Sequence, residues 1–500
     1  MSPGQSQKRP IVQELIQRAT GGIKFHRHIL FHPSLAYQIL QDPFWVWCQY
    51  HAPKTEAVDE ISRYDEMRMQ RGIKHEQEWI QRHYPEAIEI KPPFGYPALR
   101  NTFKAMLEGA AAIYQPQLWD LAGETYGKAD LLVRDDSCDS DLGPYHYRLF
   151  EIKRSKSLKE YHVLQAAFYN RMLGYIQGHT ADELTVVLKD AQQRISYNGR
   201  ENQLEDTLSK WKSLRNGSWL PEPRRPPAAA ASPWRLYGNH LVEERKDLLL
   251  LAGIGSRERE KLRRAGIHRV DQLWDLPLEK TSKVLGEKYG TTAHYVAQAY
   301  RSAAPVAKPG RRLNIPRARR LLYLDFETSD DMHPTELPHV YLIGCWDGKR
   351  DQFVKFLARG AEDEERIFTE FLDFVGGTDN VKLYHWTDFE VGQMRKVMQR
   401  WPSLEGPLQR LISSCVDLKQ AIQFALYLPV PTFSIKCVAP ALGFHWRQEG
   451  FGAFESMVLY WDYLEGKGGS DIEKVVLYNE DDCVAMWHVD QELMKRLGNC

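Results

Sequence analysis

The stretch Leu321-Leu-Tyr-Leu-Asp-Phe-Glu-Thr328 decides how we interpret the C-terminal part of the chain. It begins as an apolar run of strand length, and two acids, Asp325 and Glu327, interrupt it. Side chains two positions apart on a strand lie on the same face, so both carboxylates point to one side. Buried acids are costly unless something compensates them, and a hard divalent cation such as Mg²⁺ takes oxygen ligands. The stretch therefore predicts either a metal site at a strand end or a strand end whose acids face water.

Two other segments favour the metal site. Tyr478-Asn-Glu-Asp-Asp482 falls in a helical pattern from Ile472 to about Met494. Tyr478 and Asp482 are four positions apart and therefore share one helical face. Leu383 to Glu390 predicts a short strand that runs into a helix and carries an acid directly after an aromatic residue.

Taken in order, these segments resemble the DEDDy exonucleases of the ribonuclease H-like superfamily, over about residues 318–500. The resemblance implies two bound cations held by four acids, with Tyr478 orienting the attacking water; the acids are Asp325, Glu327, Glu390 and Asp482. The third acid of that pattern is usually Asp, whereas here Phe389 is followed by Glu390. Asp388 is therefore the alternative ligand.

Length and composition limit the protein class. A chain of 500 residues is too long for one hydrophobic core, so several domains are expected. A hydrophobic fraction of 43% with 26% charged residues is ordinary for a soluble globular protein. Lys+Arg and Asp+Glu are both 66, so any contact with nucleic acid must come from local basic patches.

Cysteine usage and the N-terminus bear on the cell compartment. The seven cysteines are scattered without a CxxC pair, which argues against a zinc ribbon or disulfide framework and fits a reducing cytoplasm. Met1 to Pro10 is polar, unlike a signal peptide, and no apolar run approaches the ~20 residues of a membrane helix. We also find no G-x-x-x-x-G-K-[ST] loop, so duplex unwinding would need a separate helicase.

A second acidic constellation lies in the N-terminal half. Residues 127–134 and 147–153 predict paired strands joined by an acidic loop over 135–143. Glu151 and Lys153 share a face, and Asp130 is expected on the preceding strand. Asp followed by Glu-x-Lys is the PD-(D/E)XK arrangement. In it the carboxylates hold a cation, and the ammonium beside the phosphate lowers the cost of the developing negative charge.

Flanking residues extend this constellation. A helix predicted from Leu158 to Leu173 carries Gln165 and Tyr169, one turn apart, and Q-x-x-x-Y after Glu-x-Lys resembles the RecB-like nucleases, over about residues 25–215. A long charged helix predicted from Val58 to His83 contains Gly72 followed four residues later by Glu76, which resembles the first motif of that branch. The resemblance implies that Glu76 is a further metal ligand and that Gln165 and Tyr169 position the strand. His75 is the alternative ligand, and an exposed polar helix face is the structural alternative.

Two segments were interpreted as linkers. Asn216 to Trp234, rich in proline and alanine, predicts a linker or strap rather than a core element. RecB-like relatives often carry an iron–sulfur cluster after this point, but residues 231–239 contain no cysteine, so we expect none. Ser302 to Arg320 is a basic linker in which Arg311 and Arg312 either line a path for a phosphate backbone or are simply solvated.

Between the linkers, Gly253-Ile-Gly255 and a following Gly-Ile turn resemble a helix-hairpin-helix module. Glycines at a helix start let backbone N–H groups approach a phosphate closely, so Gly253 and Gly255 are candidate nucleic-acid contacts. The alternative is a helical spacer whose glycines only make turns.

The combination resembles the TM0106-type family of RecB-like nucleases over nearly the whole chain. We expect an α/β multidomain fold with a PD-(D/E)XK restriction-endonuclease-like core, a helical hairpin module and a ribonuclease H-like mixed sheet. The expected ranges are 1–215 for the first nuclease domain, 216–236 for a linker, 237–305 for the helical module, 306–320 for the basic linker and 321–500 for the exonuclease domain.

The expected function is hydrolysis of nucleic acid, DNA in preference to RNA, at two separate sites with Mg²⁺ or Mn²⁺. DNA repair, recombination or nucleic-acid processing would use such an activity. The alternatives are a non-catalytic nucleic-acid-binding subunit with one site retired, and an RNA-processing 3′–5′ exonuclease.

Overall fold

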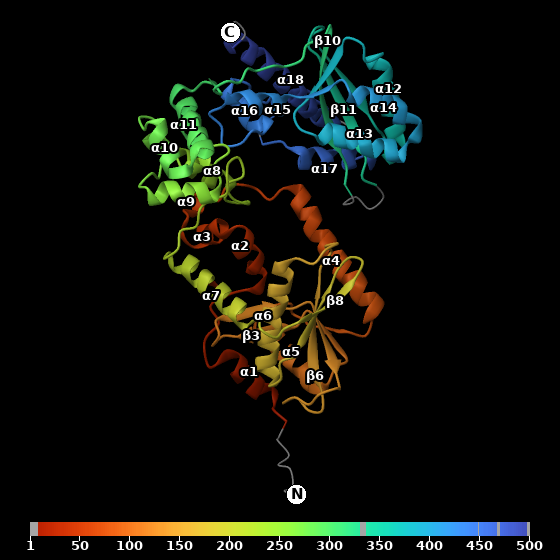
Figure 1. Cartoon of the computed structure of the whole chain (residues 1–500). Coiled ribbons are helices and arrows are strands. Elements are labelled where there is room, and N and C mark those ends of the chain that lie inside the picture. The colour runs from red at the N-terminus through yellow and green to blue at the C-terminus, as the bar shows by residue number, and fades with distance from the viewer. Residues whose placement is uncertain (1–8, 331–336, 449, 468–470, 498–500) are drawn as a thin grey trace. The chain divides into compact units, whose positions relative to one another are not determined.

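The structure is a computed structural model that describes residues 9–330, 337–448, 450–467 and 471–497 (Figure 1). Most of the polar N-terminal stretch, and Cys500, lie outside these residues. The chain divides into two compact units. Unit 1 comprises Met1–Ala57 with Arg68–Pro223, and unit 2 comprises Val58–Met67 with Arg224–Cys500. Among the described residues, none of the helices combines the length and apolar character needed to cross a membrane.

Unit 1 is built around a mixed sheet in the order β1-β2-β5-β6-β7-β8. β6 is antiparallel to β5 and parallel to β7, which confirms the strand pairing predicted across the acidic loop. The single strand predicted over 127–134 is wrong in extent, because β4 ends at Lys128 and pairs with β3 in a separate hairpin. The strands are β1 (Ile88–Glu89), β2 (Ala112–Tyr114), β3 (Gln117–Asp120), β4 (Thr125–Lys128), β5 (Leu131–Asp135), β6 (His146–Ile152), β7 (Glu183–Val187) and β8 (Gln192–Ser196).

Helix α6 packs against β6 and β7 and lies along the sheet in Figure 1. Ala166 and Ala167 are small and fully buried, which lets the helix approach the sheet closely, and Phe168 fills the space beside them. This packing fixes the rotation of the helix and with it the direction of its polar side chains. The helices of unit 1 are α1 (Val12–Thr20), α2 (Ala36–Gln41), α3 (Pro43–His51), α5 (Gly95–Glu108), α6 (Glu160–Gln177) and α7 (Glu201–Asn216), and α4 (Arg63–His83) enters it from residue 68 onward.

Unit 2 contains a second mixed sheet in the order β12-β11-β10-β13-β14. β10 is central, antiparallel to β11 and parallel to β13, and Leu322, Tyr323 and Leu324 are fully buried in it. The strands predicted at 321–328 and before Glu390 are confirmed as β10 (Arg320–Thr328) and β13 (Val381–His385). The other strands of this sheet are β11 (Val340–Asp347), β12 (Gln352–Leu357) and β14 (Cys415–Asp417). β9 (Val306–Ala307) pairs separately with β15 (Leu426–Tyr427).

Helix α18 (Ile472–Leu497) packs across β10 and β11, confirming the long C-terminal helix predicted from its periodicity. It presents its Tyr478 to Asp482 segment toward the strand that carries Asp325. The other helices of this part are α12 (Glu364–Val375), α13 (Phe389–Arg400), α14 (Glu405–Ile412), α15 (Leu418–Ala425), α16 (Ile435–Ala441) and α17 (Ala453–Leu464).

Unit 2 also includes a helical module formed by α8 (Arg235–Glu244), α9 (Ser256–Arg264), α10 (Leu278–Leu285) and α11 (Glu287–Ser302). Gly253 has a φ of +79° and Gly255 caps the start of α9, but a short 3₁₀ turn, Leu248–Leu250, precedes them instead of the expected helix. The expectation that Asn216 to Trp234 stays out of the core is wrong for its second half. Ala229, Ala230 and Trp234 are buried there, since small apolar side chains on an extended backbone pack readily.

The predicted helix from Val58 is also wrong at its start, because α4 begins at Arg63. The residues before it run without helix, and the Asp59 carboxylate accepts hydrogen bonds from the backbone N–H groups of Arg235 and Leu236, at 2.7 and 3.3 Å. Arg63 forms an ion pair with Asp462 through two hydrogen bonds. This short segment is therefore anchored within unit 2.

Candidate active sites

Three acids of unit 2 converge at the carboxyl end of β10. Asp325 and Glu327 extend from one face of the strand, and Asp482 faces them from α18. One carboxylate oxygen from each lies within 4.8 Å of the others. Glu327 and Asp482 are buried and Asp325 is half-buried. The strand periodicity predicted the pairing of the first two acids, and the helix supplies the third.

Burial and mutual repulsion disfavour ionisation of these acids. Burial, and then the charge of Asp482, raise the pKa of Asp325 to about 8. The pKa of Glu327 is raised in the same way, by burial first and then by Asp325. Like charges this close need a cation to be held together in ionised form.

Glu390 is the fourth acid of this site, whereas Asp388 points elsewhere. Glu390 is buried at the start of α13 and lines the same pocket as Asp325 and Glu327. Burial and the charge of Asp325 raise its pKa. Asp388 is exposed at the N-terminus of that helix and does not line the pocket.

Tyr478 lies on α18 one turn before Asp482 and lines the pocket. It is buried, and burial together with the charge of Asp482 raises the pKa of its phenol. The hydroxyl therefore stays protonated and can donate a hydrogen bond.

Three further residues around these acids were not predicted. Asn479 is fully buried and donates from Nδ2 to the Asp325 carboxylate at 2.7 Å and to its backbone oxygen at 3.1 Å. Lys436 Nζ and Trp446 Nε1 both donate to Asp482 Oδ1, at 2.5 and 2.6 Å. The i, i+3 spacing of Asn479 and Asp482 was a signal for the first. Nothing local signals the other two, which the fold brings from 36 to 46 residues away.

The acids open into a pocket of about 510 Å³. Aromatic side chains form part of its wall, among them Trp386, Phe389 and Phe433. Phe389 is 41% exposed, which is high for such a large apolar side chain. Exposed aromatic faces beside a carboxylate cluster are surfaces on which unpaired bases can stack.

Unit 1 holds the second constellation at the end of β6. Lys153 Nζ lies 2.6 Å from Glu151 Oε1 and 3.8 Å from Asp130 Oδ2. Asp130 is placed just before β5 rather than on the predicted strand, and its Oδ2 accepts the backbone N–H of Ile152 at 2.7 Å. That hydrogen bond ties the acid to the neighbouring strand.

Charge balance at this site is set by the lysine. Burial raises the pKa of Glu151, and the charge of Asp130 adds to it. Burial alone would lower the pKa of Lys153, but the two carboxylates more than offset this and the pKa is raised. Lys153 is therefore a permanent cation between two acids.

The structure brings Glu76 to the same place. Gln115 Nε2 donates to Glu76 Oε1 at 3.1 Å, and burial followed by the charge of Asp130 raises the Glu76 pKa. His75 is half-buried, and its burial, followed by the charge of Arg154, lowers its pKa. The geometry thus groups Glu76, not His75, with Asp130.

Gln165 and Tyr169 project from α6 toward this site. Gln165 Nε2 donates to Glu151 Oε1 at 2.7 Å. Tyr169 is buried, and its ring lies so close to Gly127 that a Cβ there would be 2.7 Å from the ring. Gln165 therefore contacts an acid of the site directly, whereas the Tyr169 ring packs beside Gly127.

Both sites have the donor set that a divalent cation requires. Glu151 Oε2 and Glu390 Oε2 are buried and, among the described residues, have no hydrogen-bond partner. A buried carboxylate oxygen without a partner is costly, and a cation would satisfy it. The ligands on offer are carboxylate oxygens, which suit Mg²⁺ or Mn²⁺.

Two arginines of the basic linker are engaged in ion pairs. Arg317 forms an ion pair with buried Asp490, and Arg320 forms one with Asp347, so neither is free for a phosphate. Arg311 lies over the Phe424 ring at 4.4 Å, and Arg312 is exposed. Lys308 Nζ donates to the backbone oxygen of Gln423, a residue of the pocket wall, so Lys308 lies beside the pocket.

Comparison with known proteins agrees with the geometry of unit 2. The RNase_H superfamily model matches residues 322–494, which include Asp325, Glu327, Glu390, Tyr478 and Asp482. No curated protein matches the chain. The sheet order, the acid cluster and this match together show a ribonuclease H-like domain of the nuclease type at the C-terminal end of the chain.

Proposed function

We propose that the protein is a metal-dependent nuclease that hydrolyses phosphodiester bonds, with its main site in unit 2. The observation that carries this proposal is the cluster of Asp325, Glu327 and Asp482, whose oxygens lie within 4.8 Å of one another at the base of an open pocket. Three acids this close together, two of which, Asp325 and Glu327, have raised pKa values, are unfavourable in a purely structural role. A cation-binding role accounts for their placement.

The proposal gives a role to the four acids, to Tyr478 and to three residues that hydrogen-bond to the acids. Asp325, Glu327, Glu390 and Asp482 would hold Mg²⁺ or Mn²⁺, which supplies charge for the phosphate and lowers the pKa of water when bound. Tyr478, neutral at physiological pH, donates a hydrogen bond that orients the attacking water. Asn479 keeps Asp325 in its rotamer, and Lys436 with Trp446 does the same for Asp482.

We propose a second, PD-(D/E)XK-type site of RecB-like character in unit 1. Glu76, Asp130 and Glu151 would hold the cation, and Lys153 would stabilise charge on the phosphate. The support is geometric, because Lys153 contacts Glu151 Oε1, and the other oxygen, Oε2, is buried without a hydrogen-bond partner among the described residues. Gln165 would position Glu151, and Tyr169 would shape the wall behind it.

The proposed substrate is nucleic acid, with DNA favoured, and the proposed cleavage is from chain ends. Aromatic residues of the pocket favour an unpaired strand end, and Arg311, Arg312, Gly253 and Gly255 are proposed contacts to its backbone. We further propose that the protein acts with a separate helicase and is located in the cytoplasm.

Two alternatives make different predictions. A non-catalytic binding subunit would bind oligonucleotides without cleaving them, although the complete acid sets argue against it. An RNA-processing 3′–5′ exonuclease would cleave RNA in preference to DNA, because the same fold can contact the 2′-hydroxyl.

The test is incubation of the full-length protein with end-labelled single- and double-stranded DNA and RNA, in Mg²⁺, Mn²⁺ or EDTA. Cleavage should require the metal. In the Lys153→Ala background, which removes the unit 1 activity, Glu390→Gln should lower the remaining rate by more than the roughly 100-fold that loss of a supporting group costs, whereas the matched control Asp388→Asn should leave that rate nearly unchanged. Metal-independent cleavage, or the reverse ranking of these variants, would contradict the assignment.

A further inference from the structure

A group of metal-ligand type lies in unit 1 outside both proposed nuclease sites. It consists of Cys138, in the loop between β5 and β6, His146, the first residue of β6, and His179, two residues after the end of α6. One ligand atom from each lies within 4.8 Å of the other two. Cys138 and His146 are eight residues apart, but His179 is 41 residues from Cys138, and the sequence pattern gave no reason to connect the three.

The distances are close to those of a bound zinc ion. Cys138 Sγ lies 3.8 Å from His179 Nδ1. Zinc bonds of about 2.3 Å to sulfur and about 2.1 Å to nitrogen, at a tetrahedral angle, place the two ligand atoms about 3.6 Å apart. The imidazole rings of His146 and His179 have centroids 4.6 Å apart at 66°, so the rings do not stack face to face. No two of the three ligand atoms are more than 4.8 Å apart, against roughly 3.4–3.6 Å when they share one ion.

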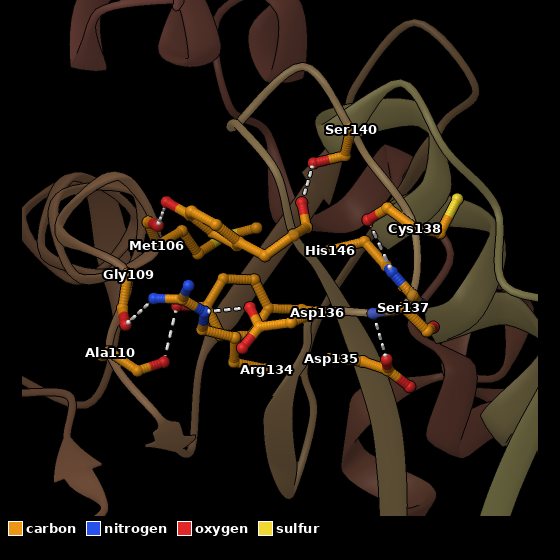
Figure 2. A network of polar contacts seen from close by, with 12 residues as sticks. Met106, Gly109, Ala110, Arg134, Asp135, Asp136, Ser137, Cys138, Ser140 and His146 are labelled. Carbon is orange, nitrogen blue, oxygen red and sulfur yellow. Dashed lines mark hydrogen bonds and ion pairs between the residues drawn. The ribbon is translucent and has the colours of Figure 1, made fainter.

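His146 is already oriented as a ligand. Its Nδ1 lies 3.3 Å from the backbone oxygen of Cys138, a contact that Figure 2 shows directly. When Nδ1 donates to this carbonyl, the lone pair is on Nε2 and is free to bind a metal. A hydrogen bond from the second ring nitrogen to a backbone carbonyl is the usual way in which proteins orient a zinc-binding histidine. His146 is also buried, which limits its other orientations.

The backbone around the group is held in place. Gln177, fully buried at the end of α6, donates from Nε2 to the backbone oxygens of His179 and Tyr147, at 2.8 and 3.1 Å. Its Oε1 accepts the backbone N–H of Tyr147 at 2.8 Å. One side chain thus ties the segment carrying His179 to the strand carrying His146. Asp141, in the same loop as Cys138, is bound by Arg18 at 2.8 Å.

The group is separate from the nuclease site of unit 1. His146 and Glu151 lie five residues apart on β6, about 17 Å along an extended strand. Gln177 and Gln165 are twelve residues apart on α6, about 18 Å along the helix. β6 therefore carries Glu151 at one end and His146 at the other, and α6 carries Gln165 near one end and is followed by His179 at the other.

We propose that Cys138, His146 and His179 form a zinc site that fastens the β5–β6 loop to the end of α6. One thiolate and two imidazoles are ligands that favour Zn²⁺ over Mg²⁺. Cys138 is exposed, so water can take the fourth position and an ion can enter from solvent. Binding releases the thiol proton to solvent. The ion would hold the acidic loop against the helix that positions Gln165, without taking part in cleavage.

The test is titration of chelator-treated, full-length protein with Co²⁺ as a spectroscopic substitute for Zn²⁺, in excess Mg²⁺ to occupy the carboxylate sites. One equivalent of Co²⁺ should produce a thiolate-to-metal charge-transfer band, and Zn²⁺ should abolish it. Cys138→Ser and His179→Ala should lose the band, whereas Cys415→Ser and His28→Ala, which change the same residue types elsewhere, should keep it. No band in the wild type, or a band that survives Cys138→Ser, overturns the proposal.

A second measurement uses unmodified protein and does not depend on how the variants fold. Mass spectrometry after iodoacetamide treatment should show that Zn²⁺ slows alkylation of Cys138 at least several-fold. Alkylation at equal rates with and without Zn²⁺ would mean that Cys138 is an ordinary exposed thiol, and would overturn the proposal.

Discussion

Asn479 holds Asp325 by two hydrogen bonds, and the space that it occupies depends on a glycine. Gly344 pairs with Asp325 across β10 and β11, and a Cβ at Gly344 would lie 1.7 Å from Asn479 Oδ1. We therefore expect Gly344→Ala to displace Asn479 and to destabilise the protein by about 1–3 kcal/mol, because the buried amide has no room to move. Chemical denaturation measures this.

The matched control for that prediction is Gly392→Ala. Gly392 lies inside α13, where an added Cβ would have no neighbour within 4 Å. Alanine is a better helix former than glycine, so this variant should be stabilised by up to about 1 kcal/mol. Equal effects of the two substitutions would contradict the packing that we describe around Asp325.

The raised pKa of Asp325 predicts how stability changes with pH in metal-free protein. The carboxyl titrates near pH 4 in the unfolded chain, whereas burial and then the charge of Asp482 raise its pKa to about 8 in the folded state. The folded state therefore holds this proton more tightly. The resulting stabilisation is complete below about pH 4 and is lost as the pH rises through about 8.

This effect is measurable as the slope of Tm against pH in chelator. The Tm of the wild type should fall over that range more steeply than the Tm of Asp325→Asn, in which the group cannot ionise. Added Mg²⁺ should restore the Tm of the wild type most strongly at the high-pH end, because the ionised acids bind it. Equal slopes for the two proteins would mean that Asp325 is not desolvated as described.

At the scale of helices and strands, the sequence predicted the structure best for segments that form an element of the core and also contain candidate site residues. The apolar runs around 320–328 and 381–385 and the periodicity of 472–494 predicted β10, β13 and α18, and the acids on them follow from strand and helix geometry. Lys436 and Trp446 could not be predicted in this way, because their contact with Asp482 depends on tertiary packing.

The segment before α4 shows the same limit. Its charged pattern predicted a helix from Val58, but the Asp59 carboxylate caps another helix, α8, whose own N-cap residue, Trp234, does not cap it through its side chain. The start of α4 is set by this tertiary contact together with a local cap, since Ser62 Oγ accepts the backbone N–H of Asp65 at 3.1 Å. The burial of Ala229 and Ala230 in a proline-rich stretch has a similar cause, since composition alone cannot tell a solvated linker from one packed on a helical module.

This cap leads to a prediction. Asp59→Ala removes the acceptor for the first backbone N–H groups of α8 and should cost about 0.5–2 kcal/mol of stability, the usual loss for an N-cap. Glu60→Ala, at the neighbouring exposed position, should change stability by less than about 0.5 kcal/mol. A stability curve unchanged by Asp59→Ala would show that the cap contributes nothing.

At the scale of the whole molecule, the two acid clusters belong to different compact units and share no residue. Lys153 and Glu151 are in unit 1, whereas Asp325 and Asp482 are in unit 2. We therefore propose that the two sites are chemically independent, each with its own acids and its own positioning residues. A substitution in one cluster leaves the ligands of the other unchanged.

The most direct test of this central claim is cleavage of end-labelled single- and double-stranded substrates in Mg²⁺ by four full-length proteins: the wild type, Lys153→Ala, Asp482→Asn and the double variant. Lys153→Ala should abolish only one activity and Asp482→Asn only the other, the two differing in preferred ends or strandedness. The double variant should not cleave but should still bind nucleic acid, more weakly as salt rises. If Lys153→Ala alone removes all cleavage, the ribonuclease H-like site is inert or depends on the first, and the claim of two independent nuclease sites is wrong.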